Sequence, residues 1–223
     1  MGIKKNYYII DFDSTFVKKE GLEVLAEVAL EGNPKKMPIL AQIKKITAAG
    51  MEGRLSFKES LSRRLRLIKA NEYHVGQTAD LIKNKITLSF WRNKNFIKKN
   101  GGRIYIISGA FRELITPTIS LFDIAPNHIL ANNFIYNQNG EIVGCDEKNP
   151  LTQTGGKAKA VASLHLRGVV WAVGDGYTDY EIKKRGAADY FVAYTENVKR
   201  PSVVNNADFE VKNFNQLLNL FSN

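Results

Sequence analysis

The first hydrophobic segment of the chain is short and contains no alternating polar positions. Residues Tyr7–Ile10 form an unbroken apolar run made of residue types that favour β-structure. A run of this kind is typical of a strand buried on both faces of a parallel sheet. Two aspartates, Asp11 and Asp13, come directly after it. Taken alone, they could equally mark an ordinary turn at the end of a strand.

From Glu20 to about residue 100 the apolar positions are spaced as in helices. The pattern predicts helices over 20–30, 39–49, 75–86 and 90–100, and a capping box at Ser56–Glu59 predicts the start of one more. We expect Gly50 and Gly53 to hold Met51 in a loop between two of these helices. Because residues 17–89 contain no clear strand, they are predicted to form a small helical subdomain inserted after the first strand.

The remainder of the chain alternates strands with helices. Strands are predicted over 103–107, 129–131, 169–173, 190–193 and 208–211, and helices over 111–122, 156–166, 178–185 and 213–221. Pro117 is expected to kink or split its helix, and a hairpin is expected over 134–144 with its turn at Asn139–Gly140. This alternation predicts an α/β fold with a doubly wound, mostly parallel sheet, built from residues 1–16 and 90–223.

Composition narrows the class of protein but does not identify it. The chain has 223 residues, of which 44% are hydrophobic and 24% charged, as in soluble globular proteins. No apolar run approaches the roughly 20 residues that a transmembrane helix needs. Cys145 is the only cysteine, which excludes an intrachain disulfide and a thiolate metal site. We therefore expect a cytoplasmic protein without a membrane partner.

The formal net charge of +10 raises the question of an anionic partner. The basic residues occur mostly as scattered pairs, such as Lys18–Lys19 and Arg63–Arg64, without a long basic run or interleaved aromatic residues. This favours a solvated basic surface, or a basic rim that attracts an anionic substrate, over a nucleic-acid-binding surface. We expect no nucleic-acid partner.

Polar residues follow three of the predicted buried strands. Asp11 and Asp13 follow the first, Ser108 and Gly109 the second, and Asp175 a later one. The carboxyl ends of parallel strands lie at one edge of a sheet, so these groups should converge there. Lys157, at the start of a predicted helix, is a further candidate at that edge.

Together these residues offer the groups that phosphoryl transfer requires. Carboxylates suit Mg²⁺, a hydroxyl with a tight backbone suits an oxyanion, and an ammonium group supplies positive charge. The cysteine and the three histidines lie outside these segments. The nucleophile would then be a carboxylate or a metal-bound water.

Four segments, in this order, resemble the motifs of the haloacid dehalogenase (HAD) superfamily of phosphatases. They are Asp11–Thr15, Ile107–Gly109, Lys157 and Gly174–Asp179. A finer resemblance, to the phosphoserine phosphatase branch, rests on Glu20, 51–65, Ala131–Asn132 and Gly155–Lys157. The resemblance implies a Rossmann-like core, here 1–16 and 90–223, with a helical cap domain, here 17–89, inserted after the first motif.

The resemblance also implies roles for the residues of the core. Asp11 would attack phosphorus and form a phosphoaspartate, while Asp13 would act as general acid and then general base. Ser108, the Gly109 backbone N–H and Lys157 would bind the phosphoryl oxygens. The Mg²⁺ ligands would be Asp11, the backbone carbonyl of Asp13, and Asp175, with Asp179 ordering the surroundings of the ion. Thr178 would support the substrate or a water.

In the cap, the resemblance assigns Glu20 to the substrate ammonium and Arg64 to its carboxylate, with Met51 and Phe57 closing the pocket. The alternative is that Glu20 and Arg64 are exposed helix charges and the other two are plain core residues. Five positions depart from the family pattern, namely Ala110, Asn133, Phe134, Tyr177 and Thr178.

The leading hypothesis is Mg²⁺-dependent hydrolysis of O-phosphoserine. Its alternatives are the same chemistry on another small phosphorylated metabolite, phosphotransfer to an alcohol, and an inactive scaffold that binds nucleic acid.

Overall fold

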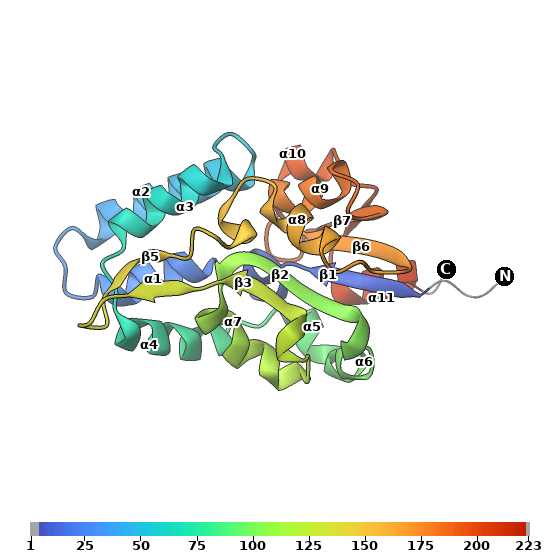
Figure 1. Cartoon of the computed structure of the whole chain (residues 1–223), viewed down its shortest axis with the longest axis horizontal. Coiled ribbons are helices and arrows are strands. Elements are labelled where there is room, and N and C mark those ends of the chain that lie inside the picture. The colour runs from blue at the N-terminus through green and yellow to red at the C-terminus, as the bar shows by residue number, and fades with distance from the viewer. Residues whose placement is uncertain (1–4, 222–223) are drawn as a thin grey trace.

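A parallel six-stranded sheet forms the centre of the computed structural model, which describes residues 5–221 (Figure 1). The strand order is β3-β2-β1-β6-β7-β8, and every neighbouring pair is parallel. The strands are β1 (Asn6–Ile10), β2 (Ile104–Phe111), β3 (Ile129–Asn132), β6 (Val169–Gly174), β7 (Tyr190–Tyr194) and β8 (Phe209–Val211). The predicted α/β fold is confirmed. Residues 1–4 and 222–223, also predicted as core, lie outside the described residues.

Successive residues of β1 point to opposite faces of the sheet, and each face is covered by helices. Ile10 belongs to a hydrophobic cluster shared with α5, α6, α7 and α11, and Ile9 to a cluster shared with α8, α9 and α10. The covering helices are α5 (Leu88–Arg92), α6 (Lys94–Lys99), α7 (Arg112–Ile119), α11 (Phe214–Phe221), α8 (Gly156–Ala162), α9 (Tyr177–Lys184) and α10 (Pro201–Val204). This two-sided burial explains why the strand sequence lacks polar alternation.

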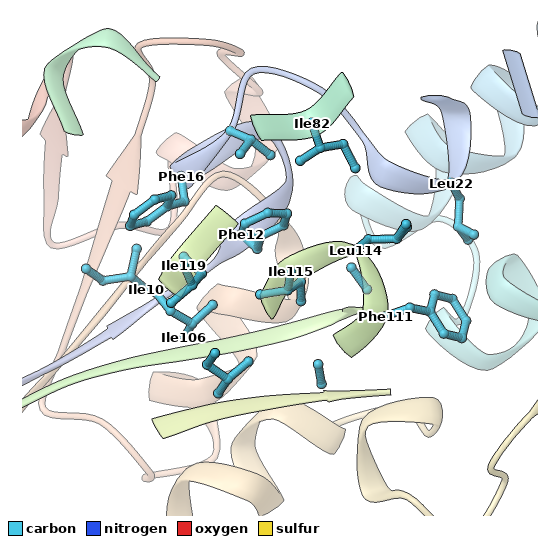
Figure 2. Close-up of a cluster of buried hydrophobic side chains, with 14 of the residues drawn as sticks. Ile10, Phe12, Phe16, Leu22, Ile82, Ile106, Phe111, Leu114, Ile115 and Ile119 are labelled. Carbon is cyan, nitrogen blue, oxygen red and sulfur yellow. The ribbon is translucent and has the colours of Figure 1, made fainter. Parts of the chain in front are cut away.

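The chain between β1 and α5 is helical, as predicted. Its helices are α1 (Gly21–Ala29), α2 (Lys36–Met51), α3 (Phe57–Leu67) and α4 (Glu72–Lys83). Leu22 of α1 and Ile82 of α4 join Leu114 of α7 in one buried cluster (Figure 2). On the other side of α1, α2 and α3 lie side by side and extend towards α9 (Figure 1). The helical segment is thus fixed to the sheet domain through α4 and α7, and it covers the sheet edge with α2 and α3.

Two aromatic residues anchor the turn that follows β1. Phe12 and Phe16 are completely buried, and Figure 2 shows both rings in the cluster beneath this turn. Between them Ser14 adopts a left-handed conformation with φ 55°. Burying two phenylalanine side chains stabilises the turn by roughly 3–6 kcal/mol. The aspartates beside Phe12 are directed to the sheet edge because the rings occupy the core.

Several boundaries differ from the predictions. Gly50 and Met51 do not lie in a loop but in the last turn of α2. A Cβ at Gly50 would lie 2.8 Å from Ser60 Oγ of α3, so this glycine serves close helix packing rather than helix termination. The helix predicted over 90–100 divides at Asn93 into α5 and α6. The helix predicted over 111–122 does not split at Pro117, since α7 continues to Ile119, and a kink at Pro117 stays a prediction.

The strands differ from the predictions at two places. Strand β2 does not stop at Ile107 but runs to Phe111, with a shift in its pairing to β3 between these two residues. The hairpin of β4 (Phe134–Tyr136) and β5 (Ile142–Cys145) turns at residues 138–139, followed by Gly140 at φ 72°. Glycine thus closes the turn as the left-handed residue rather than occupying its centre. No helix within residues 5–221 is long and apolar enough to cross a membrane.

Candidate active site

The predicted catalytic residues converge at the carboxyl edge of the sheet, beside β1. The strand order reverses direction here, with β2 on one side of β1 and β6 on the other. Asp11, Asp13, Ser108 and Lys157 all line one small cavity, and each is at least nine-tenths buried. The remaining lining residues come from both the sheet domain and the helical segment, and they are Glu20, Leu22, Met51, Phe57, Arg64, Gly109, Ala110 and Thr178.

Lys157 connects two of the acidic residues. Its Nζ lies 2.7 Å from Oδ1 of Asp11 and 2.7 Å from Oδ1 of Asp179. Burial alone would lower the pKa of Lys157, but the two carboxylates outweigh it and hold that pKa above its usual value. Lys157 is therefore a permanent positive charge beside Asp11.

A cluster of carboxylates lies next to Lys157. One oxygen from each of Asp11, Asp175 and Asp179 lies within 4.8 Å of the others, and all three side chains are buried. Burial and Asp11 raise the pKa of Asp179 to about 7, against the opposing effect of Lys157. Buried like charges at this separation are unfavourable unless cations compensate them, and carboxylate oxygens are the ligands that Mg²⁺ prefers. The donor set thus fits a divalent cation.

Asp175 has two further partners that the sequence analysis missed. Thr15 Oγ1 donates a hydrogen bond of 2.9 Å to Asp175 Oδ1, and Arg200 forms an ion pair with Oδ2. Arg200 is 25 residues away in the chain, in the segment before α10. No local motif marks it, because its role follows only from the way β7 and α10 fold back towards β6.

Asp13 has a different environment from Asp11. Its Oδ1 has no hydrogen-bond partner within the described chain. Burial, followed by the charges of Glu20 and Asp11, raises the pKa of Asp13 well above its ordinary value. A hydrogen bond from the Gly21 backbone and the charge of Arg64 oppose this shift without reversing it. Asp13 therefore keeps its proton to a higher pH than an ordinary aspartate does, and the protonated form can donate a proton.

The two charged residues predicted for substrate recognition are both buried. Ser14 Oγ donates a 2.6 Å hydrogen bond to Glu20 Oε1, while Glu20 Oε2 has no hydrogen-bond partner in residues 5–221. Arg64 is 5% exposed and donates from Nε to the Ser60 carbonyl at 3.3 Å. No carboxylate of the described residues forms an ion pair with Arg64. Burial lowers the pKa of Arg64, opposed mainly by Glu20. The alternative that these are exposed helix charges is wrong.

Met51 and Phe57 lie against the glycines of the sheet edge. A Cβ at Gly109 would lie 2.3 Å from Phe57 Cζ, and one at Gly176 would lie 3.0 Å from Met51 Sδ. The two side chains therefore close the cavity from the side of α2 and α3. Its volume is only about 20 Å³, which holds about one water molecule.

Thr178 and Tyr177 begin α9, but they face different surroundings. Thr178 lines the cavity, whereas the ring of Tyr177 packs on Gly53, where a Cβ would lie 2.9 Å from Tyr177 Cγ. Lys184 Nζ lies 5.8 Å from the centre of the same ring. The unusual tyrosine of the fourth motif thus contacts the helical segment rather than lining the cavity.

A larger cavity of about 780 Å³ lies between α3 and β5. Its lining includes Lys58, Leu65 and Val143 but none of the residues predicted for catalysis or binding. It lacks the converging buried carboxylates and lysine of the smaller cavity. The small cavity at the sheet edge is therefore the candidate active site.

Comparisons with known proteins agree with this geometry. Residues 9–182 match the family model of haloacid dehalogenase-like hydrolases. The chloroplastic phosphoserine phosphatase of Arabidopsis thaliana is 34% identical over 212 residues, which cover 94% of this chain and 69% of that protein. The phosphoserine phosphatase of Drosophila melanogaster is 29% identical, with coverages of 93% and 75%.

Solved structures are also similar in fold along nearly the whole chain. A phosphoserine phosphohydrolase-like protein from Francisella tularensis subsp. tularensis SCHU S4 superposes with a TM-score of 0.87 at 31% identity. The match covers 97% of this chain and 99% of that one.

Proposed function

Because this chain belongs to the haloacid dehalogenase-like hydrolases, as a phosphatase of the phosphoserine phosphatase-like type, we propose that its substrate is O-phosphoserine. The main support is a pair of buried, opposite charges in the cavity that also holds Asp11. Arg64 lacks a carboxylate partner in the described residues, and Glu20 has one free oxygen. The carboxylate and ammonium of an amino acid would supply the missing partners.

The proposed reaction proceeds in two steps through Asp11. In the first, a carboxylate oxygen of Asp11 bonds to phosphorus while the bond from phosphorus to the serine oxygen breaks. Asp13 gives its proton to the departing alkoxide, a role that its raised pKa supports. In the second, water attacks phosphorus, Asp13 accepts its proton, and the bond to Asp11 breaks to release phosphate.

Three groups would hold the phosphoryl oxygens during both steps. We assign this role to the Ser108 hydroxyl, the Gly109 backbone N–H and the Lys157 ammonium group, which all belong to residues that line the cavity. Fixed donors in a site closed to water stabilise developing negative charge more strongly than water does. The raised pKa of Lys157 ensures that its positive charge persists at any physiological pH.

We propose Mg²⁺ as the cofactor, since the buried carboxylates fit a divalent cation. Asp11 and Asp175 would bind it, together with the backbone carbonyl of Asp13, and Asp179 would lie beside it. The bound ion would neutralise the charge of the phosphoryl group. Thr15 and Arg200 would keep the carboxylate of Asp175 in position.

We further propose that residues 17–89 form a cap that opens to admit substrate. Two chain segments connect residues 17–89 to the core, and backbone hydrogen bonds pair them with each other. Lys18 N donates to Lys85 O at 2.8 Å, and Thr87 N donates to Phe16 O at 3.0 Å. A cavity of about 20 Å³ is far smaller than phosphoserine, so Met51 and Phe57 would have to move away before binding. Thr178 and these two side chains would then close around the substrate.

Rates of phosphate release from three substrates would test this proposal. L-phosphoserine carries both recognition groups, O-phosphoethanolamine lacks the carboxylate, and p-nitrophenyl phosphate lacks both. With Mg²⁺ we expect kcat/KM for L-phosphoserine to exceed both others by at least about a hundredfold, the effect of one well-placed charge pair. Equal values would leave a phosphatase but exclude phosphoserine as its preferred substrate. A cytoplasmic location remains a prediction.

A further inference from the structure

Asn132 does not line the cavity, but it connects two of the elements that do. Its side chain is completely buried at the end of β3. Nδ2 donates a hydrogen bond of 2.8 Å to the Gly109 carbonyl and one of 3.3 Å to the Leu151 carbonyl. A single amide group thus joins the segment of Ser108 and Gly109 to the turn that precedes α8.

The segment that contains Gly109 needs such a partner. Pairing between β2 and β3 shifts register between Ile107 and Phe111, so the regular ladder is interrupted there. A buried carbonyl without a hydrogen bond destabilises a fold, and the Asn132 side chain supplies the donor for Gly109. The interruption leaves residues 108–110 free to present groups to the cavity instead of to β3.

Holding this carbonyl also orients the Ser108 hydroxyl. The C=O and N–H of one trans peptide point in opposite directions, so fixing the Gly109 carbonyl fixes the Ala110 N–H. That N–H donates to Ser108 Oγ at 3.1 Å. Ser108 Oγ is thereby an acceptor for Ala110, and no acceptor for its own hydrogen is found along residues 5–221. The hydroxyl hydrogen is left for a ligand.

The second hydrogen bond of Asn132 acts on the side of Lys157. Leu151 lies in the turn Pro150–Thr152, and a Cβ at Gly156 would lie only 2.0 Å from the Pro150 carbonyl oxygen. This turn therefore packs directly on the first residue of α8, next to Lys157. Asn132 holds together the two backbone segments that carry Ser108 and Lys157.

The amide of Asn132 is only half satisfied. Both partners of Nδ2 are carbonyls, while Oδ1 is buried without a hydrogen-bond partner in the described chain. An unsatisfied buried oxygen reduces stability, so the contribution of this side chain lies in its NH₂ group and not in Oδ1. The two donors are the feature that an amide uniquely provides here.

We propose that Asn132 is a positioning residue for phosphoryl binding. It orients the Gly109–Ala110 peptide so that Ser108 donates into the cavity, and it fixes the turn behind Lys157. This inference rests on the proposed function, in which both residues bind phosphoryl oxygens. Asn132 itself does not touch the substrate.

A double-mutant cycle would test whether Asn132 acts through Ser108. Asn132→Ala, Ser108→Ala and the double variant are compared for kcat and KM on L-phosphoserine and p-nitrophenyl phosphate. We expect Asn132→Ala to lower kcat roughly ten- to a hundredfold, as loss of a supporting hydrogen bond commonly does, with a smaller change in KM. In the double variant the two losses should fall short of multiplying, because the part of the Asn132 loss that acts through Ser108 is already gone while the part that acts through the turn behind Lys157 remains.

The matched control is Asn133→Ala, which changes the exposed neighbour of the same type and should leave kcat unchanged. If the two losses multiply in the double variant, Asn132 does not act through Ser108 and the proposal is overturned. A wild-type enzyme without activity on any phosphomonoester would instead overturn the proposed function. These two failures are therefore distinguishable.

Two further measurements guard against variants that fail to fold. Asn132→Ser keeps one donor and a small polar side chain, so it replaces Asn132→Ala in a second double-mutant cycle. Thermal unfolding checks that each variant is folded. In the wild-type protein, inorganic phosphate should shift the side-chain NH₂ resonance of Asn132 while that of Asn133 stays unchanged. An unshifted Asn132 resonance at saturating phosphate would contradict the proposal.

Discussion

Lys157 and Arg64 are both buried cations, but of the two only Lys157 forms ion pairs with carboxylates of the described residues. Lys157 contacts Asp11 and Asp179, whereas Arg64 donates to a backbone carbonyl and forms no ion pair there. A buried charge without a partner lowers the stability of the free protein. The carboxylate of a bound amino acid would supply the missing partner and so remove this loss of stability. Part of the free energy of binding would therefore come from pairing a charge that the folded chain already buries.

Replacing Arg64 should therefore affect recognition more than catalysis. We expect Arg64→Ala to raise KM for L-phosphoserine about a hundredfold, because the substrate carboxylate loses its charged partner. KM for O-phosphoethanolamine, which has no carboxylate, should change by less than about threefold. Steady-state kinetics on both substrates measure this, with Arg63→Ala as the control because Arg63 is exposed and pairs with Glu59. An equal loss on both substrates would exclude selection by Arg64.

Glu113 offers a prediction about pH and stability away from the active site. Burial raises the pKa of Glu113 above its ordinary value, and the hydrogen bond from the Phe134 N–H only partly opposes this. The folded state thus binds the proton more tightly than the unfolded state. Stability is reduced as pH rises from the ordinary pKa through the raised one, and the full reduction persists above it.

Glu113→Gln should remove this loss of stability at high pH. The side-chain oxygen of glutamine still accepts the hydrogen bond from the Phe134 N–H. We expect a gain of less than about 1 kcal/mol at pH 7, because solvent screens a half-buried group, and no gain below about pH 4. Urea unfolding at several pH values measures both. Glu27→Gln is the control, since Glu27 is exposed on α1. A gain that is independent of pH would contradict the electrostatic explanation.

At the scale of elements, the contact between α3 and β2 depends on a glycine. Phe57, the first residue of α3, packs directly on Gly109. A Cβ added at Gly109 would lie 2.3 Å from Phe57 Cζ. Gly109→Ala keeps the backbone N–H but should hold α3 away from the sheet edge. We expect kcat/KM for L-phosphoserine to fall at least about tenfold, with partial recovery in Gly109→Ala combined with Phe57→Ala.

The matched control for this pair is Gly144→Ala in β5, where a Cβ would meet no atom within 4 Å. Its kinetics should equal those of the wild type. If the added Phe57 truncation brings no recovery, the loss arises from the backbone of Gly109 rather than from its packing against α3.

Local sequence patterns predicted most elements, and they failed where distant contacts decide. The apolar run before Asp11 identified β1, because a strand buried on both faces of a sheet carries apolar residues at successive positions. Gly50 was wrongly predicted to lie in a loop, because its close approach to Ser60 depends on the packing of α2 on α3. The contacts of Arg200 and Asn132 join segments far apart in sequence, so no spacing reveals them.

At the scale of the whole molecule, the buried carboxylates repel one another electrostatically at the centre of the fold. One carboxylate oxygen from each of Asp11, Asp175 and Asp179 lies within 4.8 Å of the others. The positive charges of Lys157 and Arg200 compensate this repulsion only in part. We expect Mg²⁺ at about a hundred times its Kd to stabilise the folded protein by about 2.7 kcal/mol. We also expect chelation to abolish turnover reversibly.

Thermal unfolding and phosphate release, each with Mg²⁺ and then EDTA, measure this prediction. Asp175→Asn should lose both the stabilisation and the activity, whereas Asp80→Asn, an exposed change on α4, should keep both. Turnover that persists in EDTA after exhaustive dialysis would exclude the proposed cofactor.

The phosphoryl group is proposed to be carried by Asp11, and this intermediate can be trapped chemically. Enzyme mixed with L-phosphoserine and Mg²⁺ is quenched in acid and reduced with borohydride, which converts an aspartyl phosphate to homoserine, and the position is located by peptide mass spectrometry. We predict homoserine at residue 11, and neither label nor turnover in Asp11→Asn. Homoserine at another aspartate, or rapid turnover by Asp11→Asn, would contradict the account.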